Sequence, residues 1–398
     1  MTSRELWIGT YPVAGAGTPV GLGEGVWAVR LDDETGALTA ARQVAELASP
    51  SFLARRPGDH EAGRLYAVLE DAPGQVASLT PTGAAAVPAG GDYPCHVVAT
   101  DRALLVANYG TGTLAVHALD ADGAICTPPV VHGHVGSGPV LDRQEGPHAH
   151  FVALAPGGRH VLVVDLGTDE IRRYDWDGTT ATPAGIAASF PPGTGPRHLD
   201  FSADGRFAYV AGELDVAVHV LAWDEASATG TLVQSVPAVV EHARPDDERA
   251  VLGQGDDPVR HGAGDLTSHL ELAGDEVLVT VRGADVLTRW DIGPDGLLTV
   301  GRSHALGGHW PRHFAVVPTP TTTSATTSPV RQSDAAAPGP AGAPASDRHP
   351  RASVQGSSGG GGWVVVALER EGALVVLDSD GTVVSRVSLP SPTCVLPV

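Results

Sequence analysis

Pro196-Arg197-His198-Leu199-Asp200-Phe201 is the clearest copy of a motif that begins a short apolar strand at seven places in the sequence. Most copies open on proline, and histidine is the commonest residue at the third aligned position. The third positions are Phe52, His96, His150, His198, His269, His313 and Cys394. A fixed repeat of this kind, with several strands in each unit, is typical of a β-propeller.

The spacing of the copies fits one blade per repeat. Phe52 and His96 lie 44 residues apart, as do His269 and His313, and a four-stranded blade takes roughly 40–50 residues. Within 195–235 the first strand is followed by an Asp-Gly turn and then by further alternating apolar strands, the pattern of consecutive hairpins. We therefore predict an all-β, seven-bladed β-propeller with four-stranded blades.

The two ends of the chain carry complementary parts of one blade. Leu6 to Tyr11 align with the second strand of the repeat, and no inner strand precedes them. The last inner strand, within 391–398, has no strand after it. Pairing of these two strands would close the ring and remove exposed sheet edges, so we expect residues 1–398 to form a single domain. Closure also favours a monomer.

Charge and composition argue against some classes of binding partner. The formal net charge is −21, and all 25 basic residues are arginine, so nucleic acid is disfavoured because its phosphates would be repelled. No apolar run could span a bilayer, and residues 1–5 lead into a strand without a signal-peptide core, so we expect a cytoplasmic protein with no membrane partner. Cys95, Cys126 and Cys394 are too scattered for a disulfide framework and are expected to be reduced.

Three insertions interrupt the repeat. Residues 319–362 are rich in Thr, Ser, Pro, Ala and Gly, and we expect them to form a disordered excursion inside the seventh blade, without catalytic residues. The polar segments 132–146 and 241–265 lie between blades. Each is expected to be a plain surface loop, with the alternative that it leans over the channel mouth and shapes a pocket.

Propeller topology places the candidate site. The inner strands run in one direction, so their first residues gather at one mouth of the central channel, where the antiparallel second strands end. The second-strand ends are Tyr11, Glu70, Tyr109, Leu166, Glu213, Arg282 and Glu369. The predicted polar rim consists of His148, His150, Arg197, His198, Glu213, His269, Arg282, Arg312 and His313.

This rim has the chemistry needed to hydrolyse a charged lactone. The guanidinium groups of Arg197, Arg282 and Arg312 suit a carboxylate or phosphate and would stabilise an oxyanion. A histidine or glutamate among them can move protons near neutral pH. We therefore expect a small anionic lactone as substrate.

The sequence resembles the seven-bladed β-propeller lactonases, which include the cytosolic type of 6-phosphogluconolactonase and the carboxy-muconate lactonising enzymes. The motifs that carry the resemblance are Leu6 to Tyr11, Gly25-Val26-Trp27, Pro147-His148-Ala149-His150, Val164-Asp165-Leu166-Gly167, Gly195-Pro196-Arg197-His198, Glu213-Leu214, Val281-Arg282-Gly283 and Pro311-Arg312-His313-Phe314. The resemblance implies a role in carbohydrate metabolism, in the pentose phosphate pathway, and assigns catalytic positions to His148, Arg197, Glu213 and Arg282. The remaining rim residues, His150, His198, His269, Arg312 and His313, are the candidate substrate-binding residues.

The sequence departs from the family pattern at two positions, where Gly212 and Val281 replace asparagines that usually precede the glutamate and the later arginine. Loss of two amides removes possible hydrogen bonds, so the reaction type is better supported than the substrate. The leading hypothesis is a metal-independent lactonase that acts on 6-phosphoglucono-1,5-lactone, with Glu213 or His148 as the general base.

The sequence is compatible with several alternatives. His148, His150, His198 and Asp165 would suit a divalent metal, but neighbouring arginines would repel a cation, so we predict neither metal nor cofactor. The rim histidines could be solvated polar residues, and Arg197 with Glu213 could be a structural ion pair. Two other functions fit the fold: a muconate-type lactonising lyase or isomerase, and a non-catalytic propeller scaffold.

Overall fold

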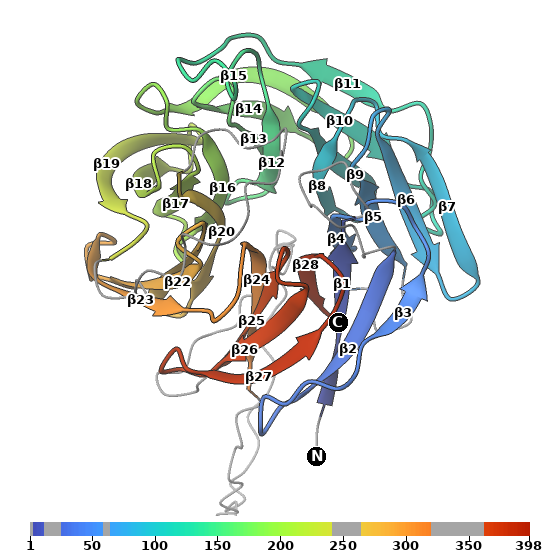
Figure 1. Cartoon of the computed structure of the whole chain (residues 1–398). Coiled ribbons are helices and arrows are strands. Elements are labelled where there is room, and N and C mark those ends of the chain that lie inside the picture. The colour runs from blue at the N-terminus through green and yellow to red at the C-terminus, as the bar shows by residue number, and fades with distance from the viewer. Residues whose placement is uncertain (1–2, 12–24, 59–63, 241–263, 320–361) are drawn as a thin grey trace, which may run out of the picture.

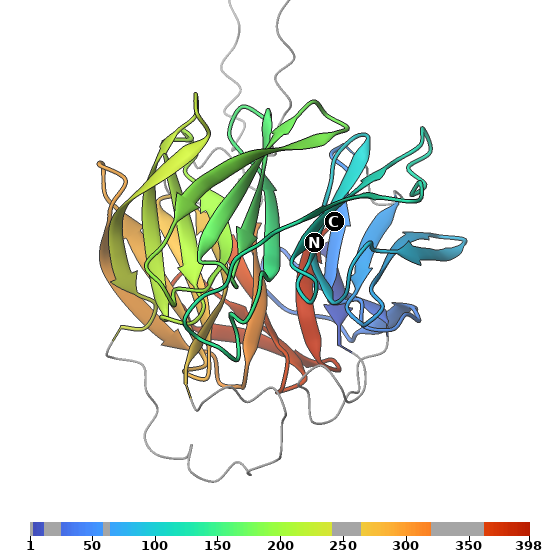
Figure 2. The same cartoon turned by 90° about the horizontal axis from the view of Figure 1, so that it is seen from above.

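The computed structural model describes residues 3–11, 25–58, 64–240, 264–319 and 362–398. The described residues form seven antiparallel sheets of four strands each, arranged as blades around a common axis (Figure 1). In the view turned by 90°, the strands of neighbouring blades run across the thickness of the ring (Figure 2). The predicted seven-bladed β-propeller is confirmed.

In each blade the first strand lines the central axis, and the second strand pairs with it on the outer side. The inner strands are β4 (Phe52–Arg55), β8 (Pro94–Ala99), β12 (Ala149–Leu154), β16 (Pro196–Phe201), β20 (Leu266–Ala273), β24 (Pro311–Pro318) and β28 (Pro392–Pro397). The second strands are β5 (Leu65–Leu69), β9 (Ala103–Asn108), β13 (His160–Asp165), β17 (Phe207–Gly212), β21 (Glu276–Arg282), β25 (Gly362–Leu368) and β1 (Ser3–Thr10).

The third and fourth strands complete each blade toward the outside. The third strands are β6 (Gln75–Thr80), β10 (Thr113–Ala118), β14 (Glu170–Trp176), β18 (Ala217–Asp224), β22 (Val286–Ile292), β26 (Ala373–Leu377) and β2 (Val26–Asp32). The outermost strands are β7 (Gly83–Pro88), β11 (Val130–Gly133), β15 (Ala181–Ser189), β19 (Thr229–Pro237), β23 (Leu298–Ala305), β27 (Val383–Ser388) and β3 (Arg42–Ala45).

The ring closes by pairing the two ends of the chain, as predicted. β28 lies antiparallel to β1, with Leu6 opposite Pro397 and Ile8 opposite Val395. The C-terminal strand therefore becomes the inner strand of the N-terminal blade, between β1 and the axis (Figure 1). This pairing satisfies backbone groups that two free sheet edges would otherwise expose.

Apolar contacts between neighbouring blades form the core. Leu162 and Val164 of β13 belong to the same buried cluster as Val210 of β17 in the next blade. Similar clusters join the other neighbouring blades, so each blade is stabilised mainly by the two beside it. The second strands β5 and β9 and the third strand β26 are buried along their whole length, which explains their continuous apolar runs.

β-bulges at the start of the inner strands shape the channel mouth. Register shifts occur between Pro94 and His96, Ala149 and Phe151, Pro196 and His198, Thr267 and Leu270, and Pro311 and His313. A regular strand turns successive side chains to opposite faces, but a bulge breaks this alternation. Adjacent residues such as Arg197 and His198 can therefore both line the same pocket.

The insertions lie at the predicted places in the topology. Residues 134–148 connect β11 to β12, 238–265 connect β19 to β20, and 319–361 connect β24 to β25, so the predicted insertions 132–146 and 319–362 each overlap a strand by one or two residues. Residues 241–263 and 320–361 lie outside the described residues, as does the predicted disorder of 319–362. In the described part of the chain the three cysteines are free thiols, and no helix there is long and apolar enough to cross a membrane.

Candidate active site

A single buried carboxylate organises one side of the channel mouth. Glu213, just after β17, is 2% exposed. Its Oε1 lies 2.5 Å from Nη2 of Arg143, and its Oε2 lies 2.8 Å from both Nε of Arg197 and Nη2 of Arg282. We call these four residues the arginine cluster. The arginines come from the loop before β12, from β16 and from β21, so the ion pairs join three blades.

The arginine cluster carries an excess of positive charge. Burial alone would raise the pKa of Glu213, but Arg282, Arg143 and Arg197 hold it well below its ordinary value. Burial lowers the pKa of Arg197 to about 9, which still leaves its guanidinium charged at neutral pH. Three guanidinium groups thus share one carboxylate, and the surplus positive charge can attract an anion.

The hydrogen bond of His148 to the backbone selects one tautomer of its neutral ring. Its Nδ1 lies 2.9 Å from the Tyr109 carbonyl oxygen, which can only accept, so in the neutral form of the ring Nδ1 carries the proton and Nε2 carries the lone pair. The ring stacks on Tyr109 with a centroid separation of 4.3 Å. Oε1 of the exposed Glu145 lies 3.3 Å from Nε2 and would stabilise the imidazolium formed by proton uptake. This geometry suits a general base.

Asp165 holds the backbone of His148 in place, and both of its carboxylate oxygens already have partners. Its Oδ1 accepts hydrogen bonds from the backbone N–H groups of His148, Gly167 and Thr168. Its Oδ2 lies 2.5 Å from Nδ1 of His134. Among the described residues no group of three or more His, Cys, Asp or Glu side chains could hold a metal ion. Metal independence stays a prediction.

A layer of buried histidines comes from the third aligned position of five inner strands. This histidine layer consists of His96, His150, His198, His269 and His313. The rings of His269 and His313 stack at 4.0 Å, and His96 packs at 4.3 Å from Phe52. Burial lowers the pKa of His269 to about 3 and holds the pKa of each of the other four well below its ordinary value. The layer is therefore neutral at neutral pH.

Hydrogen-bond directions fix the proton positions of His198 and His269. Nη1 of Arg197 can only donate, so Nε2 of His198, 3.1 Å away, must accept. Nδ1 of His198 then carries a proton and donates to Nδ1 of His269 at 2.8 Å. Both histidines were predicted to bind substrate, but this chain of contacts favours a role in orienting Arg197.

Arg312 lies in a second polar group, the acidic cluster, formed by Tyr11, Ser51, Glu70, Arg312 and Glu369. Nη1 of Arg312 donates to Glu369 at 3.2 Å, and its Nη2 donates to the Tyr11 hydroxyl. Two carboxylates thus face one guanidinium. This arrangement disfavours the phosphate-binding role expected for Arg312. His313 lies beside it in the histidine layer, where its Nδ1 accepts a hydrogen bond from the Val395 backbone.

The sequence prediction missed Arg143 and Tyr109. Arg143 belongs to the insertion 132–146, for which a plain surface loop was the favoured interpretation, and that interpretation is wrong. Gln144 anchors the loop by donating to the Leu166 carbonyl at 2.9 Å and to Asp169 at 2.8 Å. Arg143 consequently reaches Glu213 and also hydrogen-bonds Tyr109. No repeat signal marks Arg143, whereas Tyr109 occupies the same second-strand end as Glu213.

The two departures from the family pattern have a structural explanation. A Cβ at Gly212 would collide with Asp215 and His219, whose side chains are hydrogen-bonded at 3.0 Å. Val281 is fully buried in the apolar contact between neighbouring blades. Neither position therefore supplies an amide to the mouth.

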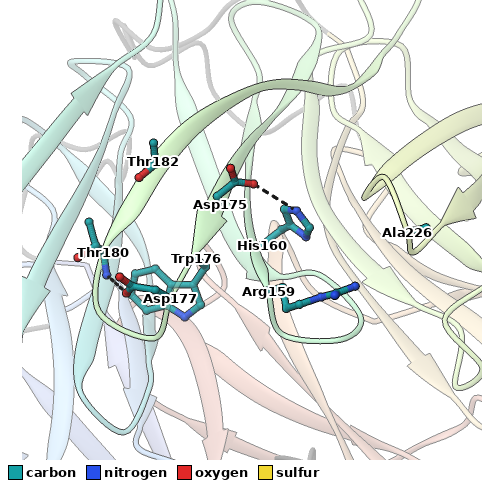
Figure 3. Close-up of a pocket in the computed structure, with 8 residues that line it drawn as sticks. All are labelled: Arg159, His160, Asp175, Trp176, Asp177, Thr180, Thr182 and Ala226. Atoms are coloured by element: carbon teal, nitrogen blue, oxygen red, sulfur yellow. Dashed lines mark hydrogen bonds and ion pairs between the residues drawn. The ribbon is translucent and has the colours of Figure 1, made fainter.

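Two hollows differ in their chemistry. A small pocket at the mouth brings Arg197 of the arginine cluster together with Glu70 and Arg312 of the acidic cluster. A larger hollow of about 390 Å³ lies on the outside of the ring, where Arg159, His160 and Asp175 line it beside Trp176 (Figure 3). In the outer hollow the His160 ring faces Asp175 at 3.4 Å, and none of its lining residues belongs to the arginine cluster.

Comparison with known proteins agrees with the seven-bladed fold and with a lactonase site. A family model described as "Lactonase, 7-bladed beta-propeller" matches residues 5–324. A 6-phosphogluconolactonase of Bacillus subtilis is 29% identical over 332 residues, which cover 80% of this chain and 86% of that protein. An uncharacterised protein of Lactococcus lactis is 30% identical over 302 residues, covering 73% and 81% of the two chains.

Solved structures share the fold. A Lactobacillus plantarum protein superposes with a TM-score of 0.75 at 23% identity, with full coverage of both chains. The periplasmic gluconolactonase of Pseudomonas aeruginosa gives a TM-score of 0.74 at 24% identity, covering 100% of this chain and 99% of the other. At these identities the structural likeness concerns the propeller alone.

We expect stability to fall as the pH drops below about 6.5, the ordinary pKa of an unfolded histidine. Below that pH the histidines of the unfolded chain bind protons. In the folded protein the buried histidine layer stays neutral until the pH approaches its lower pKa values, such as about 3 for His269. Each such histidine lowers the free energy of unfolding by about 1.4 kcal/mol per pH unit. Urea titrations at pH 7, 6, 5 and 4 measure this slope.

The variant His96→Phe tests the contribution of one histidine. Phenylalanine should fit at this position, because Phe52 occupies the equivalent position of the neighbouring blade. The variant loses one hydrogen bond, from the Val152 backbone, and about 1 kcal/mol of stability at pH 7. Its stability should then fall less steeply with decreasing pH than that of the wild type. An unchanged slope would show that His96 is not a buried neutral group.

Proposed function

This chain belongs to the family of seven-bladed β-propeller lactonases, and from that premise we propose that it hydrolyses an anionic sugar lactone, with 6-phosphoglucono-1,5-lactone as the leading substrate. The observation that carries the proposal is the pairing of a general base, His148, with a surplus of positive charge in the arginine cluster. Tyr109 links them, since its ring stacks on His148 and its hydroxyl bonds Arg143.

The proposed reaction begins with a water molecule. His148 Nε2 removes a proton from water as the oxygen attacks the lactone carbonyl carbon. The carbonyl oxygen becomes an oxyanion, which the guanidinium groups of the arginine cluster stabilise. The ring C–O bond then breaks, and the leaving alkoxide takes the proton back from the His148 imidazolium, which gives the open hydroxy acid.

Glu213 acts in this scheme as the fixed counterion of the arginines. Its carboxylate already pairs with three guanidinium groups, and its low pKa makes it a weak proton acceptor. His148 therefore suits the role of base better than Glu213, the other candidate from the sequence. Arg197, Glu213 and Arg282 together hold the charge distribution that the oxyanion needs.

The phosphate of the substrate would bind beside Arg143. The Arg143 side chain is 12% exposed and stands at the edge of the cluster, whereas Arg197 and Arg282 are enclosed. The Bacillus subtilis relative is named for the phosphorylated lactone, which supports the same substrate here. A monomer in the cytoplasm, acting in the pentose phosphate pathway without metal or cofactor, completes the proposal.

Replacing His148 by glutamine tests the base directly. His148→Gln keeps a side chain that can hydrogen-bond but removes the basic nitrogen, so we expect kcat to fall by roughly 10²–10⁴-fold with little change in KM or Tm. Acid release from freshly generated lactone, corrected for the spontaneous rate, measures the effect. Glu145→Gln, which removes the carboxylate beside Nε2 and keeps the base itself, should lower kcat far less. A folded His148→Gln enzyme with wild-type kcat would contradict the assignment.

Replacing Arg143 by alanine tests the phosphate position. We expect KM for 6-phosphoglucono-1,5-lactone to rise by about tenfold, equivalent to about 1.4 kcal/mol, while KM for glucono-1,5-lactone changes much less. Arg206→Ala removes one exposed positive charge on an outer turn of the same ring and should leave both values unchanged. Equal increases in KM for the two lactones would remove the phosphate role.

A further inference from the structure

We propose that the acidic cluster is a hydroxyl-binding subsite that selects polyhydroxylated lactones, with Glu70 as its specificity-determining residue. The inference rests on the proposed lactonase function and extends it to the half of the mouth that carries no assigned role. The subsite would take the sugar hydroxyl groups, while the arginine cluster takes the anionic end and the carbonyl of the same substrate.

Contacts within the acidic cluster fix the Glu70 carboxylate. Its Oε1 accepts a hydrogen bond from the Tyr11 hydroxyl at 2.7 Å, and its Oε2 accepts one from the Ser51 hydroxyl at 2.5 Å. Because the single hydroxyl proton of Tyr11 goes to Glu70, the Tyr11 oxygen is free to accept from Arg312. These contacts hold the carboxylate in one orientation before any substrate arrives.

The fixed carboxylate retains acceptor capacity toward the pocket. A carboxylate has about four acceptor sites, and hydroxyl donors within the described residues occupy two on Glu70. Its side chain is 12% exposed and lines the small pocket at the mouth, together with Arg197 from the arginine cluster. A ligand hydroxyl in this pocket can donate a charge-assisted hydrogen bond to Glu70.

Charge separates the two halves of the mouth. Arg312 lies 3.2 Å from Glu369 and 3.8 Å from Glu70, so two carboxylates share one guanidinium. The arginine cluster has the opposite balance, with three guanidinium groups around one carboxylate. A phosphate or carboxylate is attracted to the arginine half and repelled from the acidic half, whereas hydroxyl donors favour the acidic half. A sugar acid lactone carries both kinds of group.

The acidic cluster also links neighbouring blades, and the experiment separates this structural function from substrate binding. Tyr11, Glu70, Arg312 and Glu369 come from or directly follow strands of three blades beside the ring closure, so their contacts hold those blades together. A purely structural cluster would affect Tm and would not distinguish one lactone from another.

The test compares Glu70→Gln with the wild type on glucono-1,5-lactone and on its 2-deoxy, 3-deoxy and 4-deoxy forms. We expect the substitution to raise KM for glucono-1,5-lactone about tenfold and to leave kcat within about twofold. At least one missing hydroxyl should raise KM in the wild type and have no further effect in Glu70→Gln. Glu70→Asp, which keeps the charge balance with Arg312, should also raise KM, and serves if Glu70→Gln fails to fold.

The possible outcomes are distinct. A folded Glu70→Gln or Glu70→Asp enzyme with unchanged KM, or with the same increase in KM for every deoxy lactone, overturns the subsite while the lactonase function stands. A wild-type protein that accelerates the hydrolysis of none of these lactones or of 6-phosphoglucono-1,5-lactone overturns the proposed function first, and the subsite with it.

Discussion

The site depends on one buried carboxylate that binds three guanidinium groups from separate parts of the chain. Removing four charges from water carries a large desolvation cost, which the ion pairs of Glu213 must offset. The pairing holds the positions of Arg143, Arg197 and Arg282 before substrate binds, so little reorganisation is needed when an oxyanion forms.

The propeller repeat supplies the geometry for this arrangement. Because the inner strands start at the same mouth, a residue in one blade has its counterparts in the neighbouring blades within reach. The β-bulges allow Arg197 and His198 to share one pocket, although they are adjacent in sequence. The arginine then contacts Glu213 beside it, and the histidine joins the neutral layer that holds the arginine in place.

Sequence periodicity predicted the blade count, the ring closure and the rim position of most polar residues, since these follow from a repeat with fixed spacing. It did not predict Arg143, because that residue belongs to an insertion whose path depends on the Gln144 anchor and not on the repeat. The pairing of Arg312 with Glu70 and Glu369 was also missed, although both glutamates had been aligned with Glu213. Ring closure places the N-terminal blade between the last blade and the second. Arg312 therefore lies near Glu70 as well as Glu369 at the mouth, a contact that the linear repeat does not reveal.

The most direct measurement of the central claim is acid release from freshly generated 6-phosphoglucono-1,5-lactone by the purified protein, compared with the spontaneous rate, in the presence and absence of a chelator. The account predicts a large acceleration that is the same in both conditions, because His148 and the arginine cluster supply the chemistry. A rate equal to the spontaneous one, or an acceleration abolished by the chelator and restored by a divalent metal, would contradict it.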